Sequence, residues 1–210
     1  MNSKALMLDY FLLLDVARRP WIDEDFLKKH YFCLTSKIHP DKKLQTEETL
    51  RKKAEEQLNQ VNQAYLCLKE PRLRLKHLIE LEGGFFDKKL QNIPKNLLDL
   101  FSLISELCQK ADHWIQKKSE TRSPLILAKI TQETANIIME LDHSRDQVRE
   151  MQEEMLREIR RVDEKWDAPI DVFPTRRKDH LTCLSRISGE LNFVNRWLEQ
   201  LNDRYMKLAL

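Results

Sequence analysis

The stretch SKIHPDKK, residues 36–43, places a proline between a histidine and an aspartate in a sequence that otherwise looks helical. Apolar residues recur at helical spacing on both sides of it. Pro40 lacks an amide hydrogen and disfavours helical geometry in the residue before it, so the preceding helix should end here. The stretch therefore predicts the turn of a helical hairpin, with His39 and Asp41 directed outward.

Capping residues and apolar stripes define the two helices of this hairpin. Asp23 is a suitable N-cap for a helix over EDFLKKHYFCLTSKI, because its carboxylate can accept from the free amide groups of the first turn. The predicted buried stripe of that helix is Phe26, Leu27, Tyr31, Leu34 and Ile38. The second helix is expected to begin at a Thr46 cap and to end or kink at Pro71, with a stripe of Leu50, Ala54, Leu58, Val61, Tyr65 and Leu68.

Further helices are predicted on either side of the hairpin. A short one is expected over residues 7–14, and another over RLRLKHLIELEGG, stopped by Gly83 and Gly84. Beyond a linker at 83–93, three long apolar patterns cover about 94–117, 124–166 and 175–207. The predicted fold is all-α, with a first domain at 7–82 and a C-terminal three-helix bundle at 94–210.

Composition excludes several classes of function. The 36 basic and 34 acidic residues leave a net charge of +2, too small a surplus for a surface built to bind nucleic acid. With three glycines, the chain has neither of the usual phosphate-binding loop motifs. Its six histidines form no metalloprotease-type motif and there is no nucleophile elbow, so we expect no enzymatic activity of its own.

The four cysteines show no metal-ligand spacing. Cys33, Cys67, Cys108 and Cys183 are far apart, and the first three lie among apolar residues, so we interpret them as small core residues in a reducing compartment. We expect no bound cofactor, metal or cluster. The apolar N-terminal stretch is interrupted by Asp9 and Asp15, which argues against a membrane span and favours a cytoplasmic protein.

The hairpin resembles the J domain of the DnaJ family, in which a His-Pro-Asp loop joins two antiparallel helices. The supporting motifs are a Y-F-x-x-L start at Tyr10, a helix that ends at the tripeptide, and NQAYLCLKEP at 62–71. The sequence is similar in more detail to the HscB family of iron–sulfur co-chaperones, through LDYFLLLDV, VNQAY and PRLRLKHLIELEG. The family segment P-x-x-R-x-x-[YH]-L-L-x-L-x-G is fitted by Pro71, Arg74, His77, Leu78, Leu81 and Gly83, and Ile79 departs from it.

The resemblance implies a mechanism and two partners. A J domain docks on an ATP-bound DnaK- or HscA-type chaperone and triggers ATP hydrolysis, and the C-terminal bundle delivers the scaffold protein IscU with its nascent cluster. The implied chaperone-binding residues are His39, Pro40, Asp41, Lys28, Lys29, Lys37, Lys42 and Lys43. Ordinary J domains carry a denser basic run where this chain has Phe32 and Cys33, so contact with the chaperone is expected to depend on the remaining lysines.

The implied scaffold-binding residues lie in the bundle. Alignment with the family patch places Leu97, Leu98 and Phe101 on its apolar positions and Phe193 on its aromatic position. The acidic part fits less well, because Ser102 and Ser105 stand where carboxylates are expected and leave Asp99 and Glu106 nearby. Each apolar residue is equally compatible with an ordinary place in the bundle core.

Three other functions stay open at this point. A J-domain adaptor of the same fold would recruit the chaperone to a client other than IscU. An enzyme would use His39 and Asp41 as an acid/base pair and would be active without any ATPase partner. A purely structural helical adaptor would function without His39. We expect a monomer that binds neither nucleic acid nor membrane, although the long charged helix is also compatible with a dimer.

Overall fold

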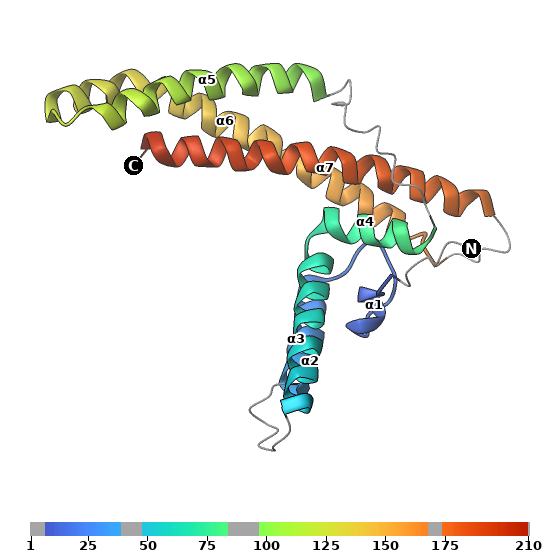
Figure 1. Ribbon diagram of the computed structural model, residues 1–210. Helices are drawn as coiled ribbons and strands as arrows, with labels where there is room; N and C mark the ends of the chain where they lie inside the picture. The colour runs from blue at the N-terminus through green and yellow to red at the C-terminus, as the bar shows by residue number, and fades with distance from the viewer. Residues whose placement is uncertain (1–6, 39–47, 84–96, 168–173, 210) are drawn as a thin grey trace, which may run out of the picture. The chain divides into compact units, whose positions relative to one another are not determined.

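The computed structural model describes residues 7–38, 48–83, 97–167 and 174–209, and within these ranges every regular element is a helix, as predicted (Figure 1). The helices are α1 Tyr10–Leu13, α2 Glu24–Ile38, α3 Glu48–Lys69, α4 Pro71–Leu81, α5 Leu98–Glu120, α6 Pro124–Asp163 and α7 Pro174–Ala209. Every helix expected from the sequence is present, with ends shifted by a few residues.

The chain divides into two compact units. Unit 1 comprises Met1–Asp87 and Glu158–Ser188, and unit 2 comprises Lys88–Arg157 and Gly189–Leu210. The boundaries predicted from the sequence, 7–82 and 94–210, differ in one respect. They assign the end of α6 and the start of α7 to the second domain, whereas the packing groups these segments with the N-terminal helices.

The α2–α3 hairpin is the centre of unit 1. Asp23 caps α2 as predicted, its Oδ1 accepting from the amide of Phe26 at 2.8 Å. Leu27, 1% exposed, and Val61, 2% exposed, line the interior of the hairpin. Phe26 was expected in the buried stripe but is 48% exposed, because it lies at the solvent-facing edge of the first turn.

The short helices α1 and α4 begin at acidic caps. Asp9 Oδ1 accepts from the amides of Phe11 and Leu12 at 2.9 and 3.2 Å, which starts α1 later than the predicted residue 7. Glu70 accepts from the first amides of α4, and Pro71 takes its first position, where no intrahelical amide is needed. Gly83 then ends this segment with a φ of +71°, a conformation that glycine adopts at low cost.

The core of unit 1 combines N-terminal and C-terminal segments. Fully or nearly fully buried side chains come from α1, α4 and the segments beyond residue 158, among them Phe11, Leu75, Leu78, Ile79, Trp166, Leu184 and Ile187. Burying each such side chain stabilises the fold by about 1.5–3 kcal/mol. Residues as far apart in sequence as Phe11 and Ile187 therefore contribute to one core.

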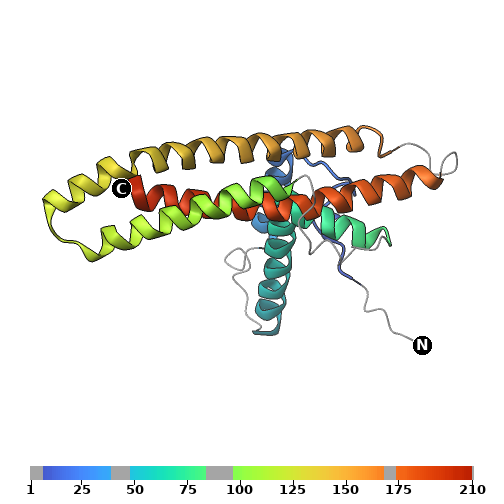
Figure 2. The same cartoon turned by 90° about the horizontal axis from the view of Figure 1, so that it is seen from above.

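Unit 2 is formed by α5 and by the parts of α6 and α7 assigned to it, and α5 and α7 lie side by side in both ribbon views (Figures 1 and 2). Its core includes Ile104, Leu107, Leu141, Val148, Leu191, Val194 and Leu201. Gln152 donates to Asn195 at 2.7 Å between α6 and α7, and Arg204 pairs with Asp112 at 2.7 Å between α7 and α5. The apolar stripe predicted for α6 is mostly buried, and most of the charged residues of this helix lie on the opposite face.

Candidate functional site

The side of α2 opposite its buried residues forms a continuous exposed surface. Lys29 lies three and four residues before Phe32 and Cys33, and Ser36 lies four and three residues after them, so the four share one helical face, and all are exposed. We call these four residues the outward face of α2. Lys28 and Lys37 flank it and are also exposed. Lys28, Lys29 and Lys37 are residues predicted to bind a chaperone.

Contacts with α3 fix the orientation of this face. The Tyr31 hydroxyl donates to Asn62 Oδ1 at 2.9 Å, and its ring stacks on Tyr65 with centroids 4.2 Å apart. Glu24 and Lys69 form an ion pair of 3.5 Å between the start of α2 and the end of α3. Because these contacts occupy the inner side of α2, the outward face is directed to solvent.

The predicted tip of the hairpin follows α2 immediately. α2 ends at Ile38 and α3 begins at Glu48, so the tripeptide occupies the connection between two paired helices. His39, Pro40, Asp41, Lys42 and Lys43 lie outside the described residues. Their role in chaperone binding stays a prediction.

Residues from the end of α6 bind the connection between α1 and α2. The Asp163 carboxylate accepts from Arg19 Nε and Nη2 at 3.0 and 2.6 Å, and from the amide of Trp21 at 3.0 Å. The Arg160 guanidinium lies 4.0 Å from the centre of the Trp21 ring. Asp163 is 8% exposed, whereas Arg19 is partly open to solvent, so these charge-assisted bonds form in a partly buried site.

Trp166, in the turn that follows α6, also contacts the connection between α1 and α2. Its indole Nε1 donates to the carbonyl of Arg18 at 2.8 Å, and the guanidinium of Arg177 lies 3.4 Å above its ring. Arg177 also donates to the Trp166 carbonyl and pairs with Glu82 at 2.9 Å. We call Asp163, Trp166 and Arg177 the clasp, because together they join the N-terminal helices to the later part of unit 1.

A buried arginine completes the support of the same connection. Arg74 is 3% exposed, and it donates to the carbonyls of Pro20 at 2.9 Å and Leu68 at 2.8 Å. Burial lowers the pKa of Arg74 to about 10, so the side chain is still charged at neutral pH. It thereby links α4 to the end of α3 and to the segment before α2.

His77 of α4 is a buried titratable group in unit 1. It is 4% exposed, its Nε2 accepts from the amide of Tyr10 at 3.1 Å, and its ring stacks on Tyr10 with centroids 4.5 Å apart. The bond requires a neutral imidazole with its proton on Nδ1. Burial lowers the pKa of His77 below its ordinary 6.5, against the attraction of Asp9 and Glu80, while Arg18 acts in the same direction as burial.

We expect the stability of unit 1 to fall as the pH falls through about 6.5. The unfolded chain takes up a proton on His77 near pH 6.5, and the folded chain does so only at lower pH. The free energy of unfolding therefore drops between these two pKa values, by at most about 1.4 kcal/mol per pH unit. The amide oxygen of His77→Gln can accept from Tyr10 but does not titrate. The free energy of unfolding of this variant, measured in urea, should therefore fall less between pH 7 and pH 5 than that of the natural chain. An identical pH dependence in both proteins would contradict it.

The predicted scaffold patch is partly brought together in unit 2. Phe101 of α5 and Phe193 of α7 both contact Trp197, each with its ring centroid 6.4 Å from that of the indole. Phe101 is 41% and Leu98 46% exposed. Leu97, in contrast, is fully buried, so its side chain is part of the core and does not reach the surface.

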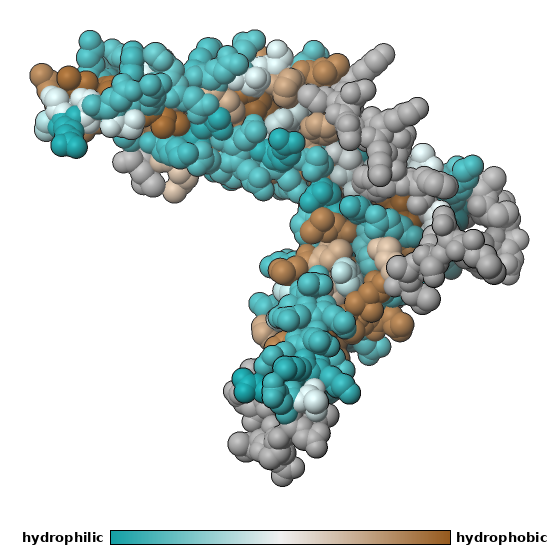
Figure 3. Space-filling model, viewed as in Figure 1, coloured by the Kyte–Doolittle hydropathy of each residue, from teal (hydrophilic) through white to brown (hydrophobic). Residues whose placement is uncertain are grey.

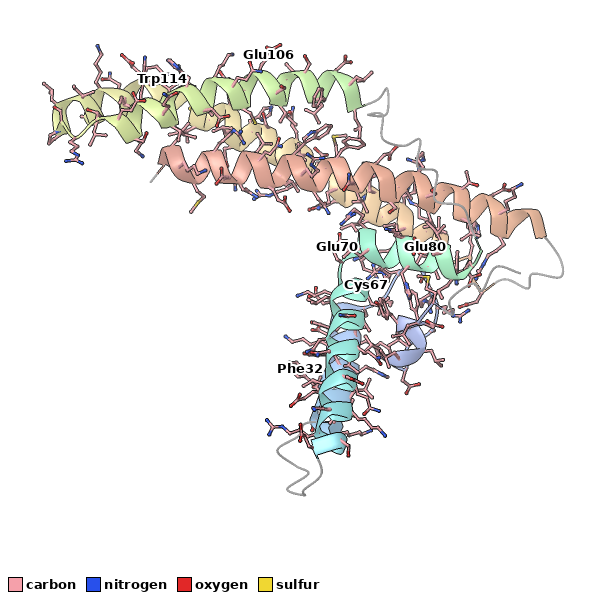
Figure 4. The ribbon with its side chains drawn as sticks, viewed as in Figure 1. Phe32, Cys67, Glu70, Glu80, Glu106 and Trp114 are labelled. Atoms are coloured by element: carbon pink, nitrogen blue, oxygen red, sulfur yellow. The ribbon has the colours of Figure 1, made fainter. Side chains whose placement is uncertain are left out.

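The polar residues beside this patch are mostly exposed. Asp99, Ser102 and Glu106 are exposed and Ser105 is half-buried, so two carboxylates remain available along α5. Figure 4 labels Glu106 on that helix. Scaffold binding by any of these residues stays a prediction.

The cysteines occupy different environments. Cys108 is buried as expected, Cys67 and Cys183 are half-buried, and Cys33 is exposed on α2, so the expectation of a core position was wrong for Cys33. Burial raises the pKa of Cys67 to about 11, which makes its thiol unreactive at neutral pH. Among the described residues no group of three histidine, cysteine or acidic side chains is placed to bind a metal ion, and no helix is long and apolar enough to cross a membrane.

Known proteins share this arrangement. The DnaJ domain model matches residues 9–77. Adaptation to cold protein J of Shewanella oneidensis is 38% identical over 68 residues, which cover 32% of this chain and 70% of that protein. Co-chaperone protein HscB of Buchnera aphidicola is 28% identical over 141 residues, 66% of this chain and 81% of the relative. The chain belongs to the HscB family of J-domain proteins.

The fold agrees with this membership of the HscB family along nearly the whole chain. The structure of chaperone HscB from Vibrio cholerae superposes with a TM-score of 0.62 at 17% identity, covering 93% of this chain and 96% of that one. The J domain contains the outward face of α2 and His77. The clasp residues Asp163 and Trp166 and the patch residue Trp197 were missed by sequence analysis, because nothing local in the sequence relates them to their distant partners.

Proposed function

We propose that the chain is a J-domain co-chaperone that stimulates ATP hydrolysis by a DnaK- or HscA-type chaperone and delivers an IscU-type scaffold for iron–sulfur cluster assembly and transfer. The observation that carries the proposal is the exposed basic surface of α2, which leads directly into His39-Pro40-Asp41. Membership of a family whose relatives are named co-chaperones supports it.

On the chaperone side, the proposed role of this surface is recognition and not chemistry. Lys28, Lys29 and Lys37 would meet an acidic surface, which increases the association rate and fixes orientation more than it adds affinity. Asp41 would pair with an arginine of the chaperone. Pro40 restricts the backbone at the tripeptide, so fewer conformations are lost on binding. The chemistry would belong to the chaperone, and the chain is proposed to have no catalytic residue.

On the scaffold side, the proposed contact surface is Leu98, Phe101 and Phe193 around Trp197. Two of these side chains are more than 40% exposed although they are large and apolar. Trp197 is 4% exposed and contacts both phenylalanine rings, so we expect it to hold them in place. A pre-arranged aromatic surface of this kind loses little entropy on binding a partner.

The double variant Leu98→Ala with Phe101→Ala is expected to bind an IscU-type scaffold at least about tenfold more weakly than the natural chain, because interface energy is concentrated in large central side chains. Titration calorimetry with the purified scaffold measures the change. Leu125→Ala is the matched control, since it removes an apolar side chain that is 81% exposed on α6, outside the proposed surface. Equal binding by the double variant and the control would exclude this surface.

A second candidate function is favoured by Ser102 and Ser105, which replace the carboxylates expected in the scaffold patch. It is an adaptor that recruits the chaperone to a different client through the same apolar surface. Stimulated ATP hydrolysis together with no affinity of the natural chain for an IscU-type scaffold would select this adaptor. Binding of the scaffold would select the iron–sulfur function.

A further inference from the structure

The outward face of α2 carries a large aromatic side chain among lysines. Phe32 is 57% exposed, and its ring lies 5.5 Å from that of its neighbour Tyr31 in a tilted arrangement. Residues 28–38 contain three lysines and no acidic residue. Within the described residues, no ion pair of Lys28, Lys29 or Lys37 is formed that would neutralise this surface.

Packing inside the hairpin does not account for Phe32. Leu27 is buried and Tyr31 faces α3, where it is fixed by its hydrogen bond to Asn62 and its stacking on Tyr65. Figure 4 shows Phe32 on the side of the hairpin away from α1, and the surface around the hairpin in Figure 3 is mainly hydrophilic. The ring therefore gives little stability to the fold, whereas aromatic residues are enriched at the centres of protein interfaces.

The position of Phe32 places it within reach of a partner that binds the tripeptide. Phe32 lies six residues before the end of α2, which is about 9 Å along the helix axis. A specific interface covers about 800 Å² on each partner. A protein that contacts His39 and Asp41 together with Lys37 thus has enough area to cover Phe32 and Lys29 as well.

We propose that Phe32 is the apolar anchor of chaperone docking and that it selects among chaperones. Its ring would enter an apolar pocket whose rim is acidic, so that the rim meets Lys28, Lys29 and Lys37 while the pocket excludes water from the ring. A chaperone with a wholly acidic, polar surface at that place would bind less tightly, because the ring would displace water from carboxylates that gain no partner in return. This inference rests on the proposed chaperone-stimulating function.

The test measures the affinity of the full-length chain for two ATP-bound chaperones, one of the HscA type and one of the DnaK type, both from the organism that encodes the chain. Phe32→Ala is expected to weaken binding to the preferred chaperone about tenfold, mainly through faster dissociation. Phe32→Lys is expected to reduce the ratio between the two affinities. Lys29→Ala should instead slow association and make binding less dependent on salt.

Phe26→Ala is the matched control, because Phe26 is an equally large aromatic of α2, 48% exposed, which lies at the first turn and contacts His30. Circular dichroism verifies that each variant keeps its helices. An equal loss of affinity for Phe26→Ala, or unchanged affinity for Phe32→Ala, overturns the inference while His39-dependent ATP hydrolysis still supports the proposed function. Failure of the natural chain to bind either chaperone refutes the proposed function and the inference together.

Discussion

Replacement of Trp166 with alanine is expected to lower the free energy of opening of unit 1 by about 3–5 kcal/mol, the range typical of large aromatic residues in a core. Trp166 is 3% exposed, donates to the carbonyl of Arg18 and lies under the guanidinium of Arg177. Its loss leaves a cavity, removes the hydrogen bond to the partly buried carbonyl of Arg18, and deprives the Arg177 guanidinium of its aromatic partner. Hydrogen exchange of amides in α1 and α4 measures the change, because these helices form the core that the clasp closes.

Trp166→Phe separates the contributions to this effect. Phenylalanine keeps most of the buried ring and its contact with Arg177 but cannot donate to Arg18, so a loss of about 1–2 kcal/mol is expected. A decrease of less than about 1 kcal/mol in the free energy of opening of α1 and α4 in Trp166→Ala would contradict the role given to the clasp.

The second large effect is expected at Asp163. Asp163→Ala should cost about 2–3 kcal/mol, because it leaves the amide of Trp21 and the guanidinium of Arg19 without the carboxylate that accepts from both. The expected cost is lower than for removal of one partner of a fully buried ion pair, since the Arg19 side chain is 37% exposed and water replaces part of the interaction. Urea unfolding at pH 7 measures this loss of stability, and hydrogen exchange of amides in the segment before α2 shows where it occurs.

Asp167 offers a control of the same charge. Its carboxylate lies 4.0 Å from Arg19 Nη2 but is 80% exposed, so Asp167→Ala should change the stability by less than about 0.5 kcal/mol. Equal costs for the two substitutions would show that net charge, and not the geometry of Asp163, stabilises the connection.

Local signals in the sequence were sufficient to predict the helices, whereas the chaperone site on α2 stays a prediction. Asp23, Pro71 and Gly83 each act within one turn of their own position, and the structure places caps and helix ends at them. The His-Pro-Asp tripeptide and its flanking lysines needed only their neighbours in the sequence to indicate a J domain.

Contacts between distant residues were beyond sequence analysis. Asp163 meets Arg19 across 144 positions, and Trp166 meets Arg18 across 148. Neither the carboxylate nor the indole differs, in the sequence, from others on a charged amphipathic helix. For the same reason Leu97 and Phe101 were indistinguishable as patch residues, because burial of one and exposure of the other depend on how α5 packs in unit 2.

The exposure of Phe26 and Cys33 has a related cause. Apolar residues on a two-helix hairpin do not all find a partner, since a single neighbouring helix covers less than half of the circumference. Helical spacing alone therefore assigned too many side chains to the core, and the stripe that is buried on α2 is narrower than predicted.

The most direct test of the central claim is the single-turnover rate of ATP hydrolysis by an HscA- or DnaK-type chaperone in the presence of the full-length chain. We predict that the natural chain raises this rate and that His39→Gln, with unchanged circular dichroism, abolishes the increase, because the variant lacks the imidazole offered to the chaperone. An equal increase with His39→Gln, or no increase with the natural chain, would contradict the account.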